Sequence, residues 1–551
     1  MLSRLRYKYL NFWSMMTIFL LVFFTIALVY PLGTLIINSV TTADGAITFD
    51  NYLKFFQKKY YYQALQHSLL IGVITTAVSI IIGTALAYVT HRFNVILKGP
   101  LKILMILSLM SPPFIGAYSW ILLCGRSGVL TNLFSKFGVT LPTIYGKTGI
   151  ILVFSLSLSC YVFRYVTAAL KGIDRSLEEA AESLGASPLR RLFTISIPVI
   201  MPSITSVMVI VFMQALSDFG TPILIGEGYK TMPVLVYNAY LSEMGGDARM
   251  AGAISVITVA ISLGILLLQK YYISKKNYKM SGLRPPIEVK LHGFKRVLVS
   301  LPGLIWVGIS LLPLITVIVT SFIKCNGPIF VGGFTFENYK EAFAHCGRSI
   351  FNSFFFSTVA LVFIVIFGIT TSYVSVRRKK QGGTLLDTLV MFPYVIPGSI
   401  IGICYIVAFN KPPFMICGTI FVILLSYTIR RLPNTVRSSV GILESIDPSL
   451  DEASISLGVP ALKTFFKITA RLMLSGIAAG AVLSWISCMN ELSSSLMLYT
   501  SGSMTMPIAV YTYVSRGNYG IAAALGTIMT AAISAALILV ARMTRKTGGI
   551  I

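Results

Sequence analysis

The sequence predicts an all-α protein that crosses a membrane about twelve times, as two similar halves of six helices each. Three observations lead to this fold class. Of the 551 residues, 55% are hydrophobic and only 12% are charged; apolar runs recur along the whole chain; and the second half repeats motifs of the first. Soluble domains carry about a quarter charged residues, so the composition excludes an ordinary soluble protein.

Each predicted span is an apolar run that can cross the hydrocarbon core, which takes about 20 residues of helix. The first half supplies runs at 12–38, 67–90, 101–124, 148–170, 199–225 and 249–270. The second half supplies runs at 297–323, 350–376, 384–409, 415–432, 471–498 and 519–541. The first run is long and no small-residue cleavage site follows it, so we expect a membrane anchor and not a removed signal peptide.

The positions of the basic residues predict the orientation of these spans. Basic residues precede the first span and follow the second, fourth, sixth, eighth and twelfth; examples are Arg4, Lys98, Arg190, Lys275 and Arg377. All these segments lie on one side if the spans alternate, and the positive-inside rule makes that side the cytoplasm, with both termini there. The net charge of +26 is therefore a topology signal, and we expect no nucleic-acid partner.

The chain repeats itself in the same orientation. The matching segments are "ITFDNYLKFF" (47–56) with "FTFENYKEAF" (334–343), "HSLL" (67–70) with "NSFF" (352–355), and "TMPVLVY" (231–237) with "TMPIAVY" (505–511). Six spans per half give both halves the same direction of entry, so a pathway is expected at their interface. We expect a first repeat over 1–274, a basic cytoplasmic linker over 275–296 and a second repeat over 297–551.

A polar, charged segment follows the fourth span of each half. The two copies are "EEAAESLGASPLRRLFTISIP" (178–198) and "DEASISLGVPALKTFFKITAR" (451–471). In the first copy, Asp174 is typical of a helix cap, and Gly185 predicts the end of that helix. We name residues 174–198 the first loop and residues 447–471 the second loop.

A second short helix is expected within the first loop. It would begin at Pro188, expose Arg190 and Arg191, and end at Pro198, where the next span begins. The loop would then be two short helices across the cytoplasmic surface, available to a partner. The alternative is a re-entry segment that merely seals the membrane interface.

These residues resemble the cytoplasmic "EAA" loop of ABC importer permeases: Glu-Ala-Ala, three residues, Gly, nine residues, then Ile-x-Leu-Pro. The first loop fills this motif with Glu179, Ala180, Ala181, Gly185, Ile195 and Pro198, and has Ile197 in place of leucine. The second loop keeps Glu452, Ala453, Gly458 and Ile468, and departs with Ser454 and Ala470-Arg471. The resemblance covers essentially the whole chain and implies the type I ABC importer permease fold.

The same resemblance implies partners and a location. In that family each loop is a coupling helix that docks on an ATP-hydrolysing subunit, which implies two copies of an ABC ATPase, an extracytoplasmic solute-binding protein and the bacterial cytoplasmic membrane. No GxxxxGK[ST] motif occurs, so we expect this chain to be no enzyme and to bind no cofactor, with ATP held by the partners.

The resemblance also suggests a solute. The fused halves, with "ALSDFGTPILIGEGY" (215–229) and "NELSSSLMLY" (490–499), look most like ferric-iron importer permeases. Thiamine, aminoethylphosphonate and polyamine permeases are the alternatives.

Asp218 and Glu491 lie late in the fifth span of each half, at the same repeat offset as the two loops (491 − 218 = 273). An intramembrane carboxylate costs a few kcal/mol, so it normally faces protein or water. The pair is predicted to line the translocation pathway and suits a cation. The structural alternative is that each caps a broken helix or hydrogen-bonds within the bundle. Proline-rich breaks at 111–116 and 392–398 are expected in the third spans, as gates or as ordinary kinks.

The sequence leaves two other function classes open. A secondary transporter would use Asp218 or Glu491 as an ion site, whereas a membrane-embedded enzyme has the least support. The seven cysteines and four histidines show no ligand spacing, so no metal site is expected. Cys325 and Cys346 flank a predicted external loop, and we expect two free thiols there in preference to a disulfide.

Overall fold

A computed structural model describes residues 12–42, 44–110, 113–241, 246–274, 288–327 and 329–545. Regular structure in these ranges is helical apart from two short hairpins, β1 (Ile323–Asn326) with β2 (Ile329–Phe334) and β3 (Asn410–Lys411) with β4 (Phe414–Met415). Among the described residues, eight helices are long and apolar enough to cross a membrane, or ten if each of two bent pairs is one span. The predicted all-α polytopic fold is confirmed.

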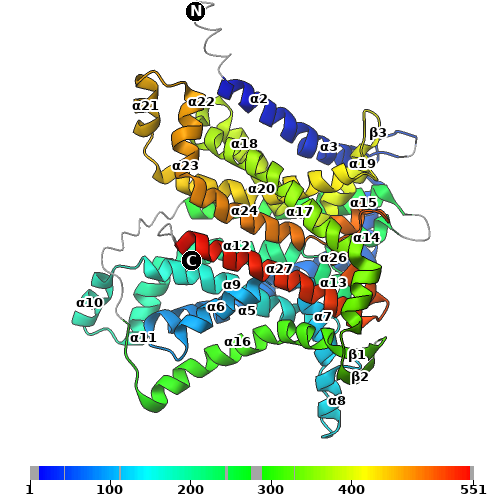
Figure 1. Cartoon of the computed structure of the whole chain (residues 1–551), viewed down its shortest axis with the longest axis vertical. Coiled ribbons are helices and arrows are strands. Elements are labelled where there is room, and N and C mark those ends of the chain that lie inside the picture. The colour runs from blue at the N-terminus through cyan, green and yellow to red at the C-terminus, as the bar shows by residue number, and fades with distance from the viewer. Residues whose placement is uncertain are drawn as a thin grey trace, which may run out of the picture.

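The first half runs in Figure 1 from blue to green. Its long segments are the continuous α2 (Phe12–Phe24), η1 (Thr25–Val29) and α3 (Tyr30–Ser39), then α5 (Lys59–Arg92), α6 (Lys98–Met110), α7 (Pro113–Cys124), α9 (Lys147–Lys171), α12 (Ile197–Ser217) and α15 (Ala248–Ser274). The short helices between them are α4 (Asp50–Gln57), α8 (Val129–Ser135), α13 (Gly220–Ile225) and α14 (Met232–Tyr240).

The second half repeats this order. Its long segments are α16 (Gly293–Ser321), α17 (Glu337–Arg377), α18 (Gly383–Val395), α19 (Gly398–Phe409), α20 (Ile420–Ser445), α24 (Leu474–Met489) and α27 (Tyr519–Arg545). Its short elements outside the second loop are η3 (Lys379–Gln381), α25 (Ser495–Leu498) and α26 (Met506–Ser515). The single helix α17 takes the place of α4 and α5 together.

The third spans contain the predicted proline breaks. In the second half, α18 and α19 meet at 109°, and Ile396 before Pro397 is extended, as the residue before a proline prefers to be. In the first half, α6 ends at Met110 and α7 begins at Pro113. The intervening Ser111 and Pro112, the start of the predicted break at 111–116, lie outside the described residues.

The predicted span 415–432 is displaced in the structure. Residues 410–415 form the β3–β4 hairpin, and α20 begins at Ile420 and continues to Ser445. The apolar run stops near Arg430, but the helix continues beyond it. The three arginines of this part, Arg430, Arg431 and Arg437, each form an ion pair with a carboxylate. Arg437, for example, lies 3.1 Å from Asp387.

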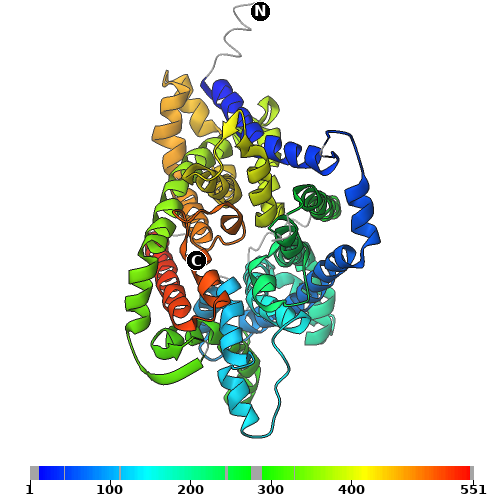
Figure 2. The same cartoon turned by 90° about the vertical axis from the view of Figure 1, so that its right-hand side faces the viewer.

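The first helix of each half packs on the other half. Trp13 of α2 lies 4.2 Å, centroid to centroid, from the Tyr373 ring of α17. In α16, the Trp306 indole donates to the Ser159 hydroxyl of α9 at 3.0 Å. Figures 1 and 2 both show the blue α2 beside the yellow-green α18. The two halves are therefore interlocked, and their apolar cores contain residues of both.

Glycines let the second and fourth spans approach closely in both halves. A Cβ at Gly83 would lie 2.5 Å from the Val162 Cβ, and one at Gly368 would lie 2.8 Å from the Thr435 Cγ2. Both partner pairs are equivalent in the repeat.

Substituting Gly83→Ala is expected to lower the free energy of unfolding by about 1–3 kcal/mol, because the added methyl group overpacks the contact between α5 and α9. Thermal unfolding of the detergent-solubilised protein measures the change. Gly264→Ala in α15 is the matched control, since nothing lies within 4 Å of its Cβ position and alanine favours a helix. Equal midpoints for the two variants would contradict the packing argument.

Candidate functional site

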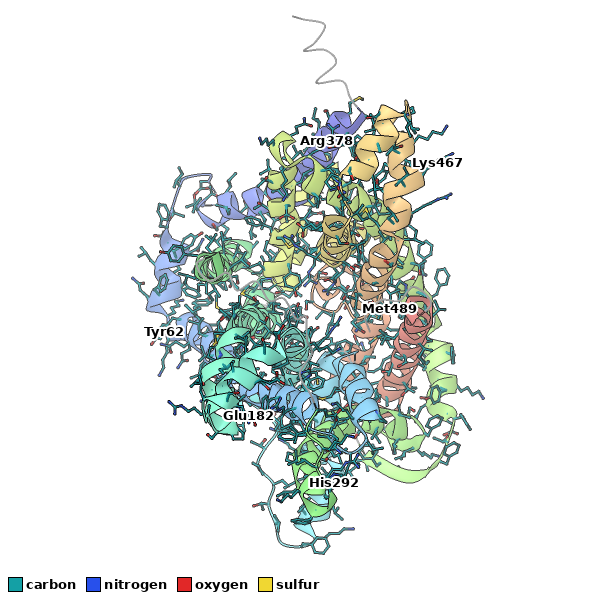
Figure 3. The ribbon with its side chains drawn as sticks, turned by 90° about the vertical axis from the view of Figure 1, so that its left-hand side faces the viewer. Tyr62, Glu182, His292, Arg378, Lys467 and Met489 are labelled. Atoms are coloured by element: carbon teal, nitrogen blue, oxygen red, sulfur yellow. The ribbon has the colours of Figure 1, made fainter. Side chains whose placement is uncertain are left out.

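The two loops lie on one face of the molecule. In Figure 1, α10 (Arg175–Ser183) and α21 (Ser449–Ser456) are at the left-hand edge, far apart along the vertical, whereas α8 and the β1–β2 hairpin are at the right. Figure 3 looks onto this left-hand face, where Glu182 marks the first loop and Lys467 the second. The shared face agrees with the repeat in sequence.

The helix of the first loop begins and ends where its residues predict. The Asp174 carboxylate accepts a hydrogen bond from the Ser176 amide at 2.9 Å and caps α10. Gly185 has φ +78°. Its amide donates to the Glu182 carbonyl, and the next amide donates to the Ala181 carbonyl, both at 2.9 Å. This pair of bonds is a Schellman motif, which requires the left-handed conformation that glycine adopts without strain.

The second loop has the same turn despite its different residues. Gly458 has φ +83°, its amide donates to the Ile455 carbonyl at 2.9 Å, and the following amide donates to the Ser454 carbonyl at 3.2 Å. At the start of the loop, Asp447 accepts from the Ser449 amide at 2.9 Å. That hydrogen bond holds the pKa of Asp447 below its usual range. The helix ends are therefore duplicated in detail.

Each loop presents large apolar side chains to the outside. The equivalent pairs are Leu177 with Leu450, Leu184 with Leu457, and Phe193 with Phe466. Leu184 is 88% exposed and Leu457 is 83% exposed. Of the motif residues, Glu179 and Ala181 are half-buried, and Ala180, Gly185, Glu452, Ala453 and Gly458 are exposed. Exposed apolar side chains at matching places are typical of a surface that a partner covers.

The predicted end of the second short helix in the first loop, at Pro198, is wrong. Helix α11 (Pro188–Arg191) continues through a π-helical turn, η2 (Leu192–Ser196), directly into α12, with Pro198 in its first turn. A proline ring clashes with the carbonyl four residues earlier in an α-helix. The wider π turn contains that residue, Thr194, and accommodates the ring.

Arg191 is also not exposed as predicted. Its guanidinium is buried and donates to the Glu182 carboxylate at 2.6 Å, which ties α11 to α10. The second loop differs here, because the Ser454 and Thr464 hydroxyls share a 2.8 Å hydrogen bond instead. Its second helix, formed by α22 (Ala461–Thr464), η4 (Phe465–Thr469) and α23 (Ala470–Leu472), meets α24 at 71°. The fifth span is bent only in the second half.

Asp218 and Glu491 lie where the fifth spans break. Helix α12 ends at Ser217, and the Asp218 carboxylate accepts from the Thr221 amide at 2.8 Å. Helix α24 ends at Met489, and Glu491 accepts from both the amide and the hydroxyl of Ser494, each at 3.1 Å. Each carboxylate thus accepts from a backbone amide just after its break and hydrogen-bonds within the bundle, as in the structural alternative.

Glu491 has a second set of partners that sequence reasoning missed. Arg430 and Arg431 of α20 each donate to one of its carboxylate oxygens. Glu491 is only 2% exposed. In the part of the chain that the structure describes, Asp218 has no ion pair. Two adjacent arginines inside the apolar stretch "SYTIRRLPNTV" (426–436) are the available signal, because buried arginines require an acid partner.

The repeat seen in the fold is also the repeat of a known family. A family model described as "Binding-protein-dependent transport system inner membrane component" matches residues 79–276 and again 364–548, together more than half of the chain. The chain belongs to this family. This permease therefore carries the family unit twice in one polypeptide, and it is a multi-pass component of the inner membrane.

Two relatives agree with this assignment. The permease is 28% identical over 536 residues to a ferric transport system permease protein of Actinobacillus pleuropneumoniae, covering 94% of this chain and 76% of the relative. It is 27% identical over 251 residues to a putative 2-aminoethylphosphonate transport system permease protein of Salmonella choleraesuis, covering 45% and 87%. A solved bacterial ABC transporter for alginate import aligns with a TM-score of 0.40 at 18% identity, covering 50% of this chain and 100% of that one.

The cysteines and the possible metal ligands are the other reactive side chains of the permease. All seven cysteines are free, including Cys325 and Cys346, so the expected free thiols are confirmed. Across the described ranges, no group of three or more His, Cys, Asp or Glu residues could hold a metal ion. The repeated "TFDNY" and "TFENY" segments start α4 and α17, where the Thr48 and Thr335 hydroxyls each accept an amide hydrogen bond.

Proposed function

We propose that this permease forms the membrane pathway of an ATP-driven importer and that each of its two loops docks one copy of a separate ATPase subunit. The observation that carries the proposal is the duplicated loop geometry. Both loops end their first helix with the same glycine turn, and both expose a leucine at the same place, Leu184 and Leu457. Two equivalent docking surfaces on one face suit two copies of one partner, with both chain termini on the same cytoplasmic side.

ATP supplies the energy in this proposal through the partners. When the ATPase dimer closes, the two loops approach each other, and the pathway changes between inward-facing and outward-facing states. A partner drives such a change only through its different affinity for the two states. Glu179, Gly185, Glu452 and Gly458 are the residues proposed to make or shape the docking contact.

The proposed solute is ferric iron delivered by an extracytoplasmic binding protein. The similarity to a ferric permease over 94% of this chain supports it. A phosphonate such as 2-aminoethylphosphonate is the second candidate, supported by a relative that matches 45% of the chain.

Asp218 and Glu491 are proposed to border the pathway, because both lie at the breaks of equivalent spans. Glu491 is charge-compensated by Arg430 and Arg431. Asp218 has no such compensation among the described residues, so it is the carboxylate proposed to face a passing cation. In this arrangement Glu491 shapes the pathway and Asp218 contributes its charge.

Reconstitution tests this function. Proteoliposomes are prepared with the permease and with the ATPase and binding protein purified from the same membranes. They are expected to take up ferric iron only when ATP is present on the side of the membrane where the ATPase is bound. Vesicles with the permease alone are expected to show no uptake under a proton or sodium gradient. Gradient-driven uptake by the permease alone would identify a secondary carrier and overturn the proposal. Labelled 2-aminoethylphosphonate, offered in parallel with its own binding protein, distinguishes the two solutes.

A further inference from the structure

A buried carboxylate fixes the first loop to two membrane-spanning segments at once. Glu178 stands one residue before the motif glutamate and is buried. One of its oxygens accepts from the Arg92 guanidinium, at the end of α5, at 2.5 Å. The other accepts from the Ser196 hydroxyl, in η2 at the entry to α12, at 3.2 Å. We name Arg92, Glu178 and Ser196 the first carboxylate link.

The second loop contains the equivalent set. Asp451 is buried, accepts from the Thr469 hydroxyl at 2.5 Å and forms an ion pair with Arg377 at 3.5 Å. Arg377 also donates to the Ile446 carbonyl at 2.8 Å. We name Arg377, Asp451 and Thr469 the second carboxylate link.

The two links occupy equivalent places in the repeat. The carboxylates and the hydroxyls are both offset by 273 residues (451 − 178 and 469 − 196), as the loops are. The arginines are offset by 285 residues (377 − 92). The "HSLL" and "NSFF" segments in the same helices have the same offset (352 − 67). The two halves therefore share the chemistry of the link, an acid, a hydroxyl and an arginine, although the acid and the hydroxyl residue differ in identity.

The first link also reaches the connection between the halves. The Arg92 carbonyl accepts from the Val289 amide at 2.8 Å, and Lys98 pairs with Glu288 at 3.1 Å. Residues 288–292 therefore lie against the end of α5, next to the ion pair that holds the first loop. The part of the predicted linker that the structure describes is packed against the first half.

We propose that the two carboxylate links are positioning elements that make each loop helix move as one body with spans two and five, so that motion of a docked ATPase reaches the pathway. This inference rests on the proposed ATPase docking. A loop helix held only by its chain ends would tilt on its own when pulled. With Glu178 bonded to both α5 and η2, any displacement of α10 must displace both spans or break a buried ion pair, which is unfavourable.

The links differ from the docking residues in where they face. Glu178 and Asp451 are turned into the protein and buried, whereas Ala180, Ala453 and the two leucines are exposed. Docking and transmission are thus assigned to adjacent residues on opposite sides of one short helix. Removing a link is therefore expected to leave the docking surface in place.

The test compares coupling with docking in the full assembly. In the variant Glu178→Gln with Asp451→Asn, co-purification of the ATPase is expected to match the unsubstituted permease. Uptake of ferric iron per ATP hydrolysed, measured in proteoliposomes with the binding protein, is expected to fall on the order of tenfold, in the range of a typical coupling free energy.

Two control variants isolate the link. Glu182→Gln removes the charge of a carboxylate on the same helix whose ion pair, to Arg191, stays within the loop. Because the Glu182 side chain is 65% exposed and glutamine keeps an oxygen that can accept from Arg191, uptake per ATP is expected to change less than about twofold. Glu178→Asp with Ser196→Thr gives the first loop the residues of the second, and it is expected to retain coupling.

Each outcome decides the proposal. Unchanged uptake per ATP in the double variant overturns it, and so does loss of ATPase co-purification, which would make the links part of the docking surface. If the double variant does not insert or fold, Ser196→Ala with Thr469→Val removes only the bonds to span five, and an unchanged ratio there also overturns it. Failure of the docking proposal itself is seen separately, as uptake by the unsubstituted permease without ATPase.

Discussion

Glu491→Gln is expected to lower the free energy of unfolding by about 3–5 kcal/mol, because it leaves the charges of Arg430 and Arg431 buried without a partner. Glutamine keeps an oxygen that can accept from Ser494, so these hydrogen bonds persist and the charge alone is removed. The thermal midpoint of the detergent-solubilised permease, followed by circular dichroism or by a thiol-reactive dye that labels the buried cysteines on unfolding, measures the loss.

Asp218→Asn is the matched control for this substitution. Asp218 accepts from the Thr221 amide in a similar way, but it has no ion pair within the described residues, and the oxygen of asparagine accepts such a bond about as well as that of aspartate. A loss within about 1 kcal/mol is expected. Combining Glu491→Gln with Arg430→Met and Arg431→Met should restore most of the stability, since apolar side chains of similar volume replace a buried ion-pair cluster at little cost. A Glu491→Gln midpoint equal to that of Asp218→Asn would contradict the charge-compensation argument.

Replacing Glu179 and Gly185 together, as Glu179→Ala with Gly185→Val, is expected to abolish co-purification of the ATPase. Nothing lies within 4 Å of a Cβ at Gly185, so an added Cβ meets no neighbour. Its cost comes from the backbone, where φ +78° is unfavourable for a residue other than glycine by about 1–2 kcal/mol. The turn that presents Leu184 is then displaced, while Glu179→Ala removes the motif carboxylate.

The ratio of ATPase to permease after affinity purification measures this effect. Glu182→Gln, on the same helix, is the control and should retain full assembly. The equivalent pair in the second loop, Glu452→Ala with Gly458→Val, disrupts the equivalent surface and is expected to abolish co-purification likewise. Full assembly and ATP-driven uptake in the first-loop double variant would refute the docking role.

Sequence alone determined the features that depend on residues within a few positions of one another. The Asp174 cap and the glycine turns at Gly185 and Gly458 follow from local backbone chemistry. The membrane spans follow from comparing the length of each apolar run with the thickness of the hydrocarbon core. The break at Pro397 follows from local backbone chemistry as well. The internal repeat, which is visible in the residues themselves, places Asp218 and Glu491 in equivalent positions.

Only the tertiary structure decided which distant groups meet. Arg430 and Arg431 reach Glu491 across about 60 residues of chain, and Arg92 reaches Glu178 across 86. Neither pairing follows from local pattern, because helix packing sets which faces touch. The packing of α2 and α16 on the opposite halves has the same origin, because it lowers the free energy through contacts between segments that the sequence does not place side by side.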